Sequence, residues 1–79
     1  MSDYERVMMI DIKANELFYE CEHGHCEPFI AFGDAHYEEP NVIVVYGMHK
    51  HTQQIERFMM DEGQLVYAPK LYRKIENAD

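Results

Sequence analysis

The residues best suited to chemistry lie in one short segment, Cys21-Glu22-His23-Gly24-His25-Cys26. Cysteine thiolates and imidazole nitrogens are ligands that zinc prefers, and a structural zinc ion takes four of them in a tetrahedron. Two more imidazoles follow at His49 and His51. The sequence therefore permits a zinc site built from Cys21, Cys26 and two of the four histidines His23, His25, His49 and His51, although the Cys-x4-Cys spacing matches no common zinc motif.

The same cluster has other interpretations. Cys26 can be the cross-strand neighbour of a small core residue, Cys21, at the tip of a hairpin with solvated histidines. A disulfide would also fit a hairpin, but the N-terminus has no recognisable signal peptide, which favours a cytoplasmic protein with reduced thiols. A cysteine nucleophile is disfavoured, because the neighbouring glutamates Glu20, Glu22 and Glu27 would raise the pKa of a thiol. We therefore expect no enzymatic activity.

The charge of the chain is unevenly distributed along its length. Its 79 residues include 15 acidic and 7 basic side chains, which gives a formal charge of −8. The first 40 residues hold ten acidic and two basic side chains, and no Lys or Arg occurs between Lys13 and Lys50. A field of one sign attracts partners of the opposite sign and repels phosphates. The pattern predicts a protein partner with a basic surface and argues against direct binding of nucleic acid.

The partner-binding surface expected from this pattern combines carboxylates with one aromatic residue. Its members are Asp11, Glu16, Phe18, Glu20, Glu22, Glu27, Asp34, Glu38 and Glu39. Such a surface suits an inhibitor or decoy that covers a basic, nucleic-acid-handling surface of a larger protein, as short acidic phage proteins directed against restriction or CRISPR systems do as a class. An acidic surface can also serve solubility alone.

Two further interpretations involve a structural metal ion that cross-links the fold and a second copy of the chain. A metal-stapled accessory or adaptor module would use Cys21, His23, His25 and Cys26, since a structural zinc ion contributes folding free energy directly. The basic C-terminal residues Lys70, Arg73 and Lys74 could pair with the acidic half, either within the fold or in a homodimer.

The apolar pattern predicts one domain, residues 1–79, because too few apolar side chains remain for a second core. No apolar run is long enough for a membrane-spanning helix, so no membrane association is expected. Alternating residues over 8–12 and 17–21 predict a hairpin that turns at Ala14 and Asn15, with Leu17, Tyr19 and Cys21 facing the core.

The rest of the chain predicts more strands and one helix. Strands are expected over 29–32, 65–68 and 71–75, and the β-branched run Val42–Tyr46 predicts a central strand. A helix is expected over 52–62, with Thr52 as its cap and a stripe of Ile55, Phe58 and Met59. The expected fold is α+β in the order β-β-β-β-α-β, with one helix packed on one face of an antiparallel or mixed sheet of four to five strands and a frayed tail at 76–79.

Overall fold

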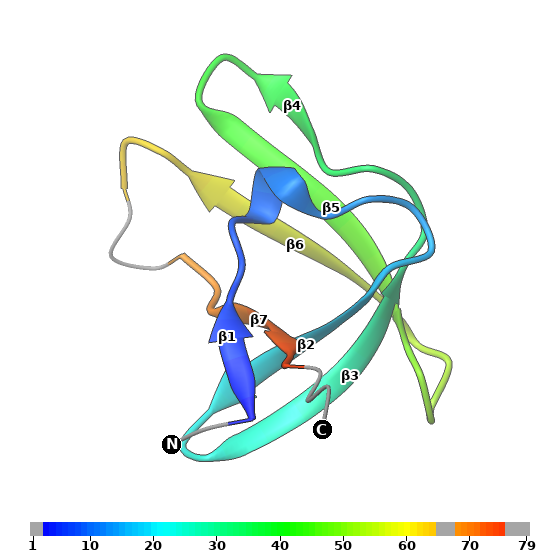
Figure 1. Ribbon diagram of the computed structural model, residues 1–79. Helices are drawn as coiled ribbons and strands as arrows, with labels where there is room; N and C mark the ends of the chain where they lie inside the picture. The colour runs from blue at the N-terminus through cyan, green and yellow to red at the C-terminus, as the bar shows by residue number, and fades with distance from the viewer. Residues whose placement is uncertain (1–2, 65–67, 76–79) are drawn as a thin grey trace.

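A computed structural model describes residues 3–64 and 68–75 and shows an antiparallel β fold (Figure 1). Its strands are β1 (Tyr4–Arg6), β2 (Leu17–Glu22), β3 (His25–Ala31), β4 (His36–Glu39), β5 (Val42–His49), β6 (Ile55–Asp61) and β7 (Leu71–Lys74), with a short 3₁₀ helix η1 (Met9–Asp11). No helix in this part of the chain is long and apolar enough to cross a membrane. The expected frayed tail and residues 65–67 of an expected strand lie outside the described residues.

The strands form one curled sheet in the order β1-β7-β2-β3-β5-β4, and β6 pairs with the other edge of β5. The strands β3 and β4 follow one another along the same edge of β5, so β5 is the central strand, as its β-branched sequence predicted. Short η1 packs against β5 on the inner side of the curl (Figure 1). The C-terminal strand β7 lies between β1 and β2.

The predicted helix over 52–62 is wrong, and the fold is mostly β-sheet rather than α+β. Residues Ile55–Asp61 pair with β5 from Met48 back to Val42. An isolated helix of about three turns is marginal in water, whereas the strand fills an otherwise open edge of β5. Because successive strand residues point to opposite faces, Phe58 enters the core while Ile55 and Met59 stay exposed.

The predicted hairpin over 8–12 and 17–21 is also wrong. Residues Met9–Asp11 form η1, and β2 pairs instead with β3 through a two-residue turn at His23 and Gly24. Both turn residues have positive φ, 54° and 79°, which suits the twist of a tight hairpin. The two faces of β2 are also the reverse of those predicted: Leu17, Tyr19 and Cys21 point away from the core, and Phe18 points into it.

The exchange of faces places Phe18 in the core. Its exposed fraction is 1%, whereas that of Leu17, expected to be buried, is 39%. The prediction that Phe18 belongs to a partner-binding surface is therefore wrong. The ring of Phe18 lies close to Phe29 and Phe58 and packs over Gly47, where an added Cβ would lie 2.8 Å from its Cζ atom.

The core occupies the inner side of the curled sheet. Its buried side chains come from η1, from the loops around it and from the strands: Met9, Ile12, Phe18, Phe29, Ala31, Ala35, Ile43, Val45, Phe58 and Leu71. Aromatic rings in edge-to-face contact contribute stability beyond the area they bury, and Phe58 makes such contacts with Phe18 and Phe29. This aromatic layer supports the polar groups that lie further along the same inner face.

Candidate functional site

The two cysteines form a disulfide at the end of the β2–β3 hairpin. Cys21 and Cys26 are directly opposite each other, as one interpretation of the sequence expected, and their sulfur atoms are bonded. The prediction of reduced thiols is wrong for this structure. Sulfur atoms joined in a disulfide are not thiolates, so in this form they cannot serve as the soft zinc ligands that the sequence suggested.

The four candidate histidines do not assemble around the cysteines. His23 lies in the exposed turn, 3.9 Å from a carboxylate oxygen of Glu22. His25 and His49 instead contact Glu27, and His51 lies in the turn between β5 and β6. The described residues contain no group of three or more His, Cys, Asp or Glu side chains placed to hold a metal ion.

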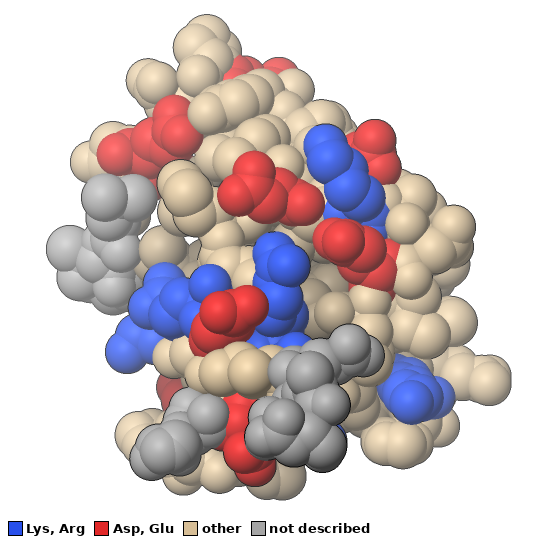
Figure 2. Space-filling view, viewed as in Figure 1, with Lys and Arg blue, Asp and Glu red and all other residues tan. Residues whose placement is uncertain are grey.

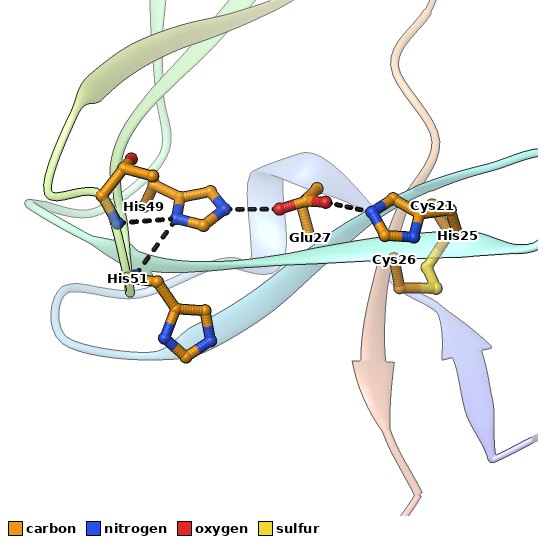
Figure 3. A network of polar contacts seen from close by, with 7 residues as sticks. Cys21, His25, Cys26, Glu27, His49 and His51 are labelled. Carbon is orange, nitrogen blue, oxygen red and sulfur yellow. Dashed lines mark hydrogen bonds and ion pairs between the residues drawn. A yellow bond between two sulfur atoms is a disulfide. The ribbon is translucent and has the colours of Figure 1, made fainter.

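Glu27 is held between two imidazoles (Figure 3). The Nε2 atom of His49 lies 2.5 Å from Oε1 of Glu27, and Nε2 of His25 contacts the other carboxylate oxygen. The side chain of His49 is 13% exposed and packs edge-to-face on Phe29, whereas that of His25 is 75% exposed. The hydrogen bonds from His49 and from His25 lower the pKa of Glu27.

The tautomer of His49 follows from its surroundings. Backbone N–H groups of His51 and Thr52 both donate to Nδ1 of His49, each over 3.1 Å. Because Nδ1 accepts these bonds, the proton of the neutral ring resides on Nε2, which donates to Glu27. The side chain of His49 thus fixes the β5–β6 turn and links it to β3. The sequence suggested His49 as a metal ligand and Glu27 as a partner-binding residue, and it carries no signal for their pairing.

Three carboxylates, those of Glu20, Glu22 and Glu56, gather on the inner face. Glu20 lies opposite Glu27 across β2 and β3. Partial burial, followed by the nearby charges of Glu56 and Glu22, raises the pKa of Glu20. No Lys or Arg within residues 3–64 and 68–75 forms an ion pair with Glu20, Glu22 or Glu56. Glu56 was not among the predicted site residues because its segment was expected to be a helix, although Glu56, Phe58 and Met60 at every second position also suit one face of a strand.

An open groove runs beside this cluster, between the β2–β3 turn and the segment that leads into β7. Its volume is about 830 Å³. The carboxylates of Asp3, Glu20 and Glu22 line the groove. The side chain of Lys70 and the Cys21–Cys26 disulfide line it as well. The groove is therefore acidic in balance and large enough for a long side chain. We call Asp3, Glu20 and Glu22 the acidic groove residues.

The other predicted acidic residues do not join this groove. Asp34 accepts a hydrogen bond from the backbone N–H of Ala14, and Glu16 accepts one from that of Lys13. Asp11 lies in η1, and Glu38 and Glu39 lie in β4. The predicted surface is thus divided among separate parts of the fold.

The charge segregation along the chain is partly cancelled in space. The basic strand β7 lies between the N-terminal strands β1 and β2, which places Arg73 3.8 Å from Glu5. Arg57 of β6 forms an ion pair with Glu38, with 2.9 Å between Nη2 and Oε1. On the face seen in Figure 2, Lys and Arg side chains lie among Asp and Glu side chains. Negative charge without a nearby Lys or Arg is therefore confined to parts of the surface.

Comparison of the chain with protein-family models, with curated proteins and with solved structures finds no match.

Proposed function

We propose that this chain is a non-enzymatic binding protein whose acidic groove takes up a basic segment of a partner protein, and that it acts as an inhibitor or decoy covering a basic, nucleic-acid-handling surface. The observation that carries the proposal is the acidic balance of the groove, which Asp3, Glu20 and Glu22 line together with Lys70, while no described Lys or Arg forms an ion pair with Glu20 or Glu22. A Lys or Arg side chain placed in the groove would form charge-assisted hydrogen bonds with these carboxylates. The carboxylates of the groove would in turn balance the positive charge of the partner's Lys or Arg side chains.

The geometry of β2 supports this kind of recognition. Glu20 and Glu22 point to the same side of the strand, about 6.6 to 6.8 Å apart along it. That spacing is comparable with the spacing of consecutive phosphates on a nucleic-acid strand. A basic surface that binds phosphates could therefore also engage these two carboxylates.

The proposal places the protein in the cytoplasm, where such partners work. Cytoplasmic thiols are generally kept reduced, so the Cys21–Cys26 bridge would there be open to reduction. The carboxylates of Glu20 and Glu22 project from the opposite face of β2 to the Cys21 side chain. The disulfide also lines the groove, but the negative charge that a cationic side chain would meet comes from the carboxylates, and reduction of the bridge does not change that charge.

The experiment that tests the proposal is a titration with an oligo-arginine peptide, followed by NMR and calorimetry at several salt concentrations. We expect amide shifts centred on Asp3, Glu20 and Glu22, and an affinity that falls as salt rises. The double variant Glu20→Gln/Glu22→Gln should weaken binding about tenfold. Equal weakening by the matched control Asp11→Asn/Glu62→Gln, which removes the same charge elsewhere, would show a general effect of net charge and would reject the groove.

A further inference from the structure

The outer face of the sheet carries an apolar band that crosses four strands. Residues directly opposite each other on paired strands share a face. Leu17 is opposite Ile30, Ile30 is opposite Met48, and Met48 is opposite Ile55. These four side chains therefore form a row from β2 to β6 on the side away from the core.

The band is widened by side chains from the neighbouring rows, and several of its members are exposed. Tyr46 and Met59 lie on the same face of β5 and β6, and the N–H of Phe32 donates to the carbonyl of Tyr46. The exposed fractions are 56% for Ile55, 54% for Phe32 and 45% for Met59. Contiguous exposed apolar side chains on a small protein mark an interaction surface.

The charges around this band are arranged in a way that fits a second copy of the chain. Glu39 and Asp61 are both opposite Val42, at the start of β5, while Lys50 follows the end of β5. Tyr46 is midway between Val42 and Lys50. A two-fold axis that passes over Tyr46, between the two sheets and perpendicular to β5, would set the basic end of one copy against the acidic end of the other. Arg57 lies on this outer face, opposite Tyr46 and between Ile55 and Met59, but its charge is already paired with Glu38.

The remaining charges favour the outer face over the inner face for contact between two copies. The net charge of −8 makes two copies repel each other. Four acidic groups of β2, β3 and β6, namely Glu20, Glu22, Glu27 and Glu56, point to the inner face, whereas Asp61 of β6 belongs to the acidic end of the outer face. Contact through the outer face therefore keeps these carboxylates on the far sides of a dimer. An isologous contact of this kind is closed and self-complementary.

We infer that the outer face of β2, β3, β5 and β6 is a homodimer interface, with Tyr46 near its two-fold axis and Phe32, Met48, Ile55 and Met59 around it. This inference goes beyond the proposed function and does not depend on it. Aromatic residues and methionine are enriched at the centres of protein interfaces, which agrees with the composition of this band.

The test is sedimentation equilibrium at about 0.15 M salt, where the Debye length is about 8 Å and long-range repulsion is screened. We expect the chain to be dimeric at about 0.1 mM and the variants Ile55→Glu and Phe32→Glu to raise the dissociation constant at least about tenfold. Met8→Glu is the matched control, because Met8 is 68% exposed but lies outside the band. If the chain remains monomeric up to about 1 mM, its dissociation constant is in the millimolar range or weaker, and the inference is overturned.

A charge exchange provides a second test that introduces no charge into the apolar band. Lys50→Glu and Glu39→Lys should each weaken the dimer, and the double variant should restore it, since each charge then meets its opposite across the two-fold axis. Failure of the double variant to restore the dimer would contradict the arrangement. Glu20→Gln/Glu22→Gln should leave dimerisation unchanged, so loss of peptide binding and loss of the dimer are distinguishable.

Discussion

His49 donates its Nε2 proton to Oε1 of Glu27 over 2.5 Å, and this bond joins the turn after β5 to the middle of the β2–β3 hairpin. The other ring nitrogen of His49 accepts two backbone N–H groups of the same turn. One imidazole therefore satisfies three partners on two hairpins. Its position over Phe29 ties this polar arrangement to the aromatic core.

We predict that Glu27→Gln reduces the stability of the protein at neutral pH and flattens its acid transition. The pKa of Glu27 is lowered in the folded state, by His49 first and then by His25. The stabilisation of the fold by the ionised Glu27 carboxylate is therefore complete above the ordinary glutamate pKa. It is lost as the pH falls through the lowered pKa of Glu27 in the folded protein. Thermal unfolding between about pH 3 and pH 7 measures this. A wild-type and a variant curve that stay parallel over this range would show that Glu27 has no such role.

The opposite sign applies to Glu20, for which we predict that Glu20→Gln is stabilising at neutral pH. Burial and then Glu56 and Glu22 raise the pKa of Glu20 in the folded state. The stability due to its protonated form is complete below the ordinary glutamate pKa and is lost as the pH rises through the folded value. Removing this partly exposed like-charge contact, worth about 0.5 kcal/mol, should raise Tm by about 2–4 °C. Asp11→Asn is the control, and an equal rise in that variant would attribute the gain to net charge.

The strand content was predictable from the sequence where side chains on both faces were apolar, as in β5. It was not predictable where the apolar residues fit both the helical period of about 3.6 residues and the strand period of two. Ile55, Phe58 and Met59 suit a helical stripe, but Phe58 and Met60 also alternate with Arg57 and Met59. The choice between them was made by β5, which needs a strand on each edge, and that requirement is tertiary.

The candidate site was predictable in its residue types but not in its partners. Glu20, Glu22 and Glu27 were expected to share one surface, and the register of β2 with β3 does place them on one face. Glu27, however, binds two histidines that the sequence offered as metal ligands, and Asp3 reaches the groove only because β7 inserts between β1 and β2. Pairing between segments distant in sequence leaves no signal in the spacing of residues.

We predict that Gly47→Ala destabilises the protein by about 1–3 kcal/mol, the cost of overpacking a close-packed core. The added methyl group would meet Cζ of Phe18 at 2.8 Å and Cβ of Phe29 at 3.3 Å, neither of which has room to retreat within the aromatic layer. Urea denaturation measures the change. Gly33→Ala is the matched control, because its added methyl group meets no atom within 4 Å. Equal effects of the two variants would mean that contact of the added methyl group with Phe18 and Phe29 does not determine the cost.

Reduction of the Cys21–Cys26 bridge should lower the stability by about 2 kcal/mol or less, because the closed loop is short and the loop-closure entropy of the unfolded chain is correspondingly small. The turn at His23 and Gly24 already favours the hairpin, which reduces the effect further. Urea denaturation with and without a thiol-free reductant measures the difference, and Cys21→Ser/Cys26→Ser shows whether reductant acts through this pair alone. The hairpin should persist after reduction, since Phe18 and Phe29 keep β2 and β3 in register. Global unfolding on reduction would show that the covalent link, and not the aromatic core, holds this end of the sheet.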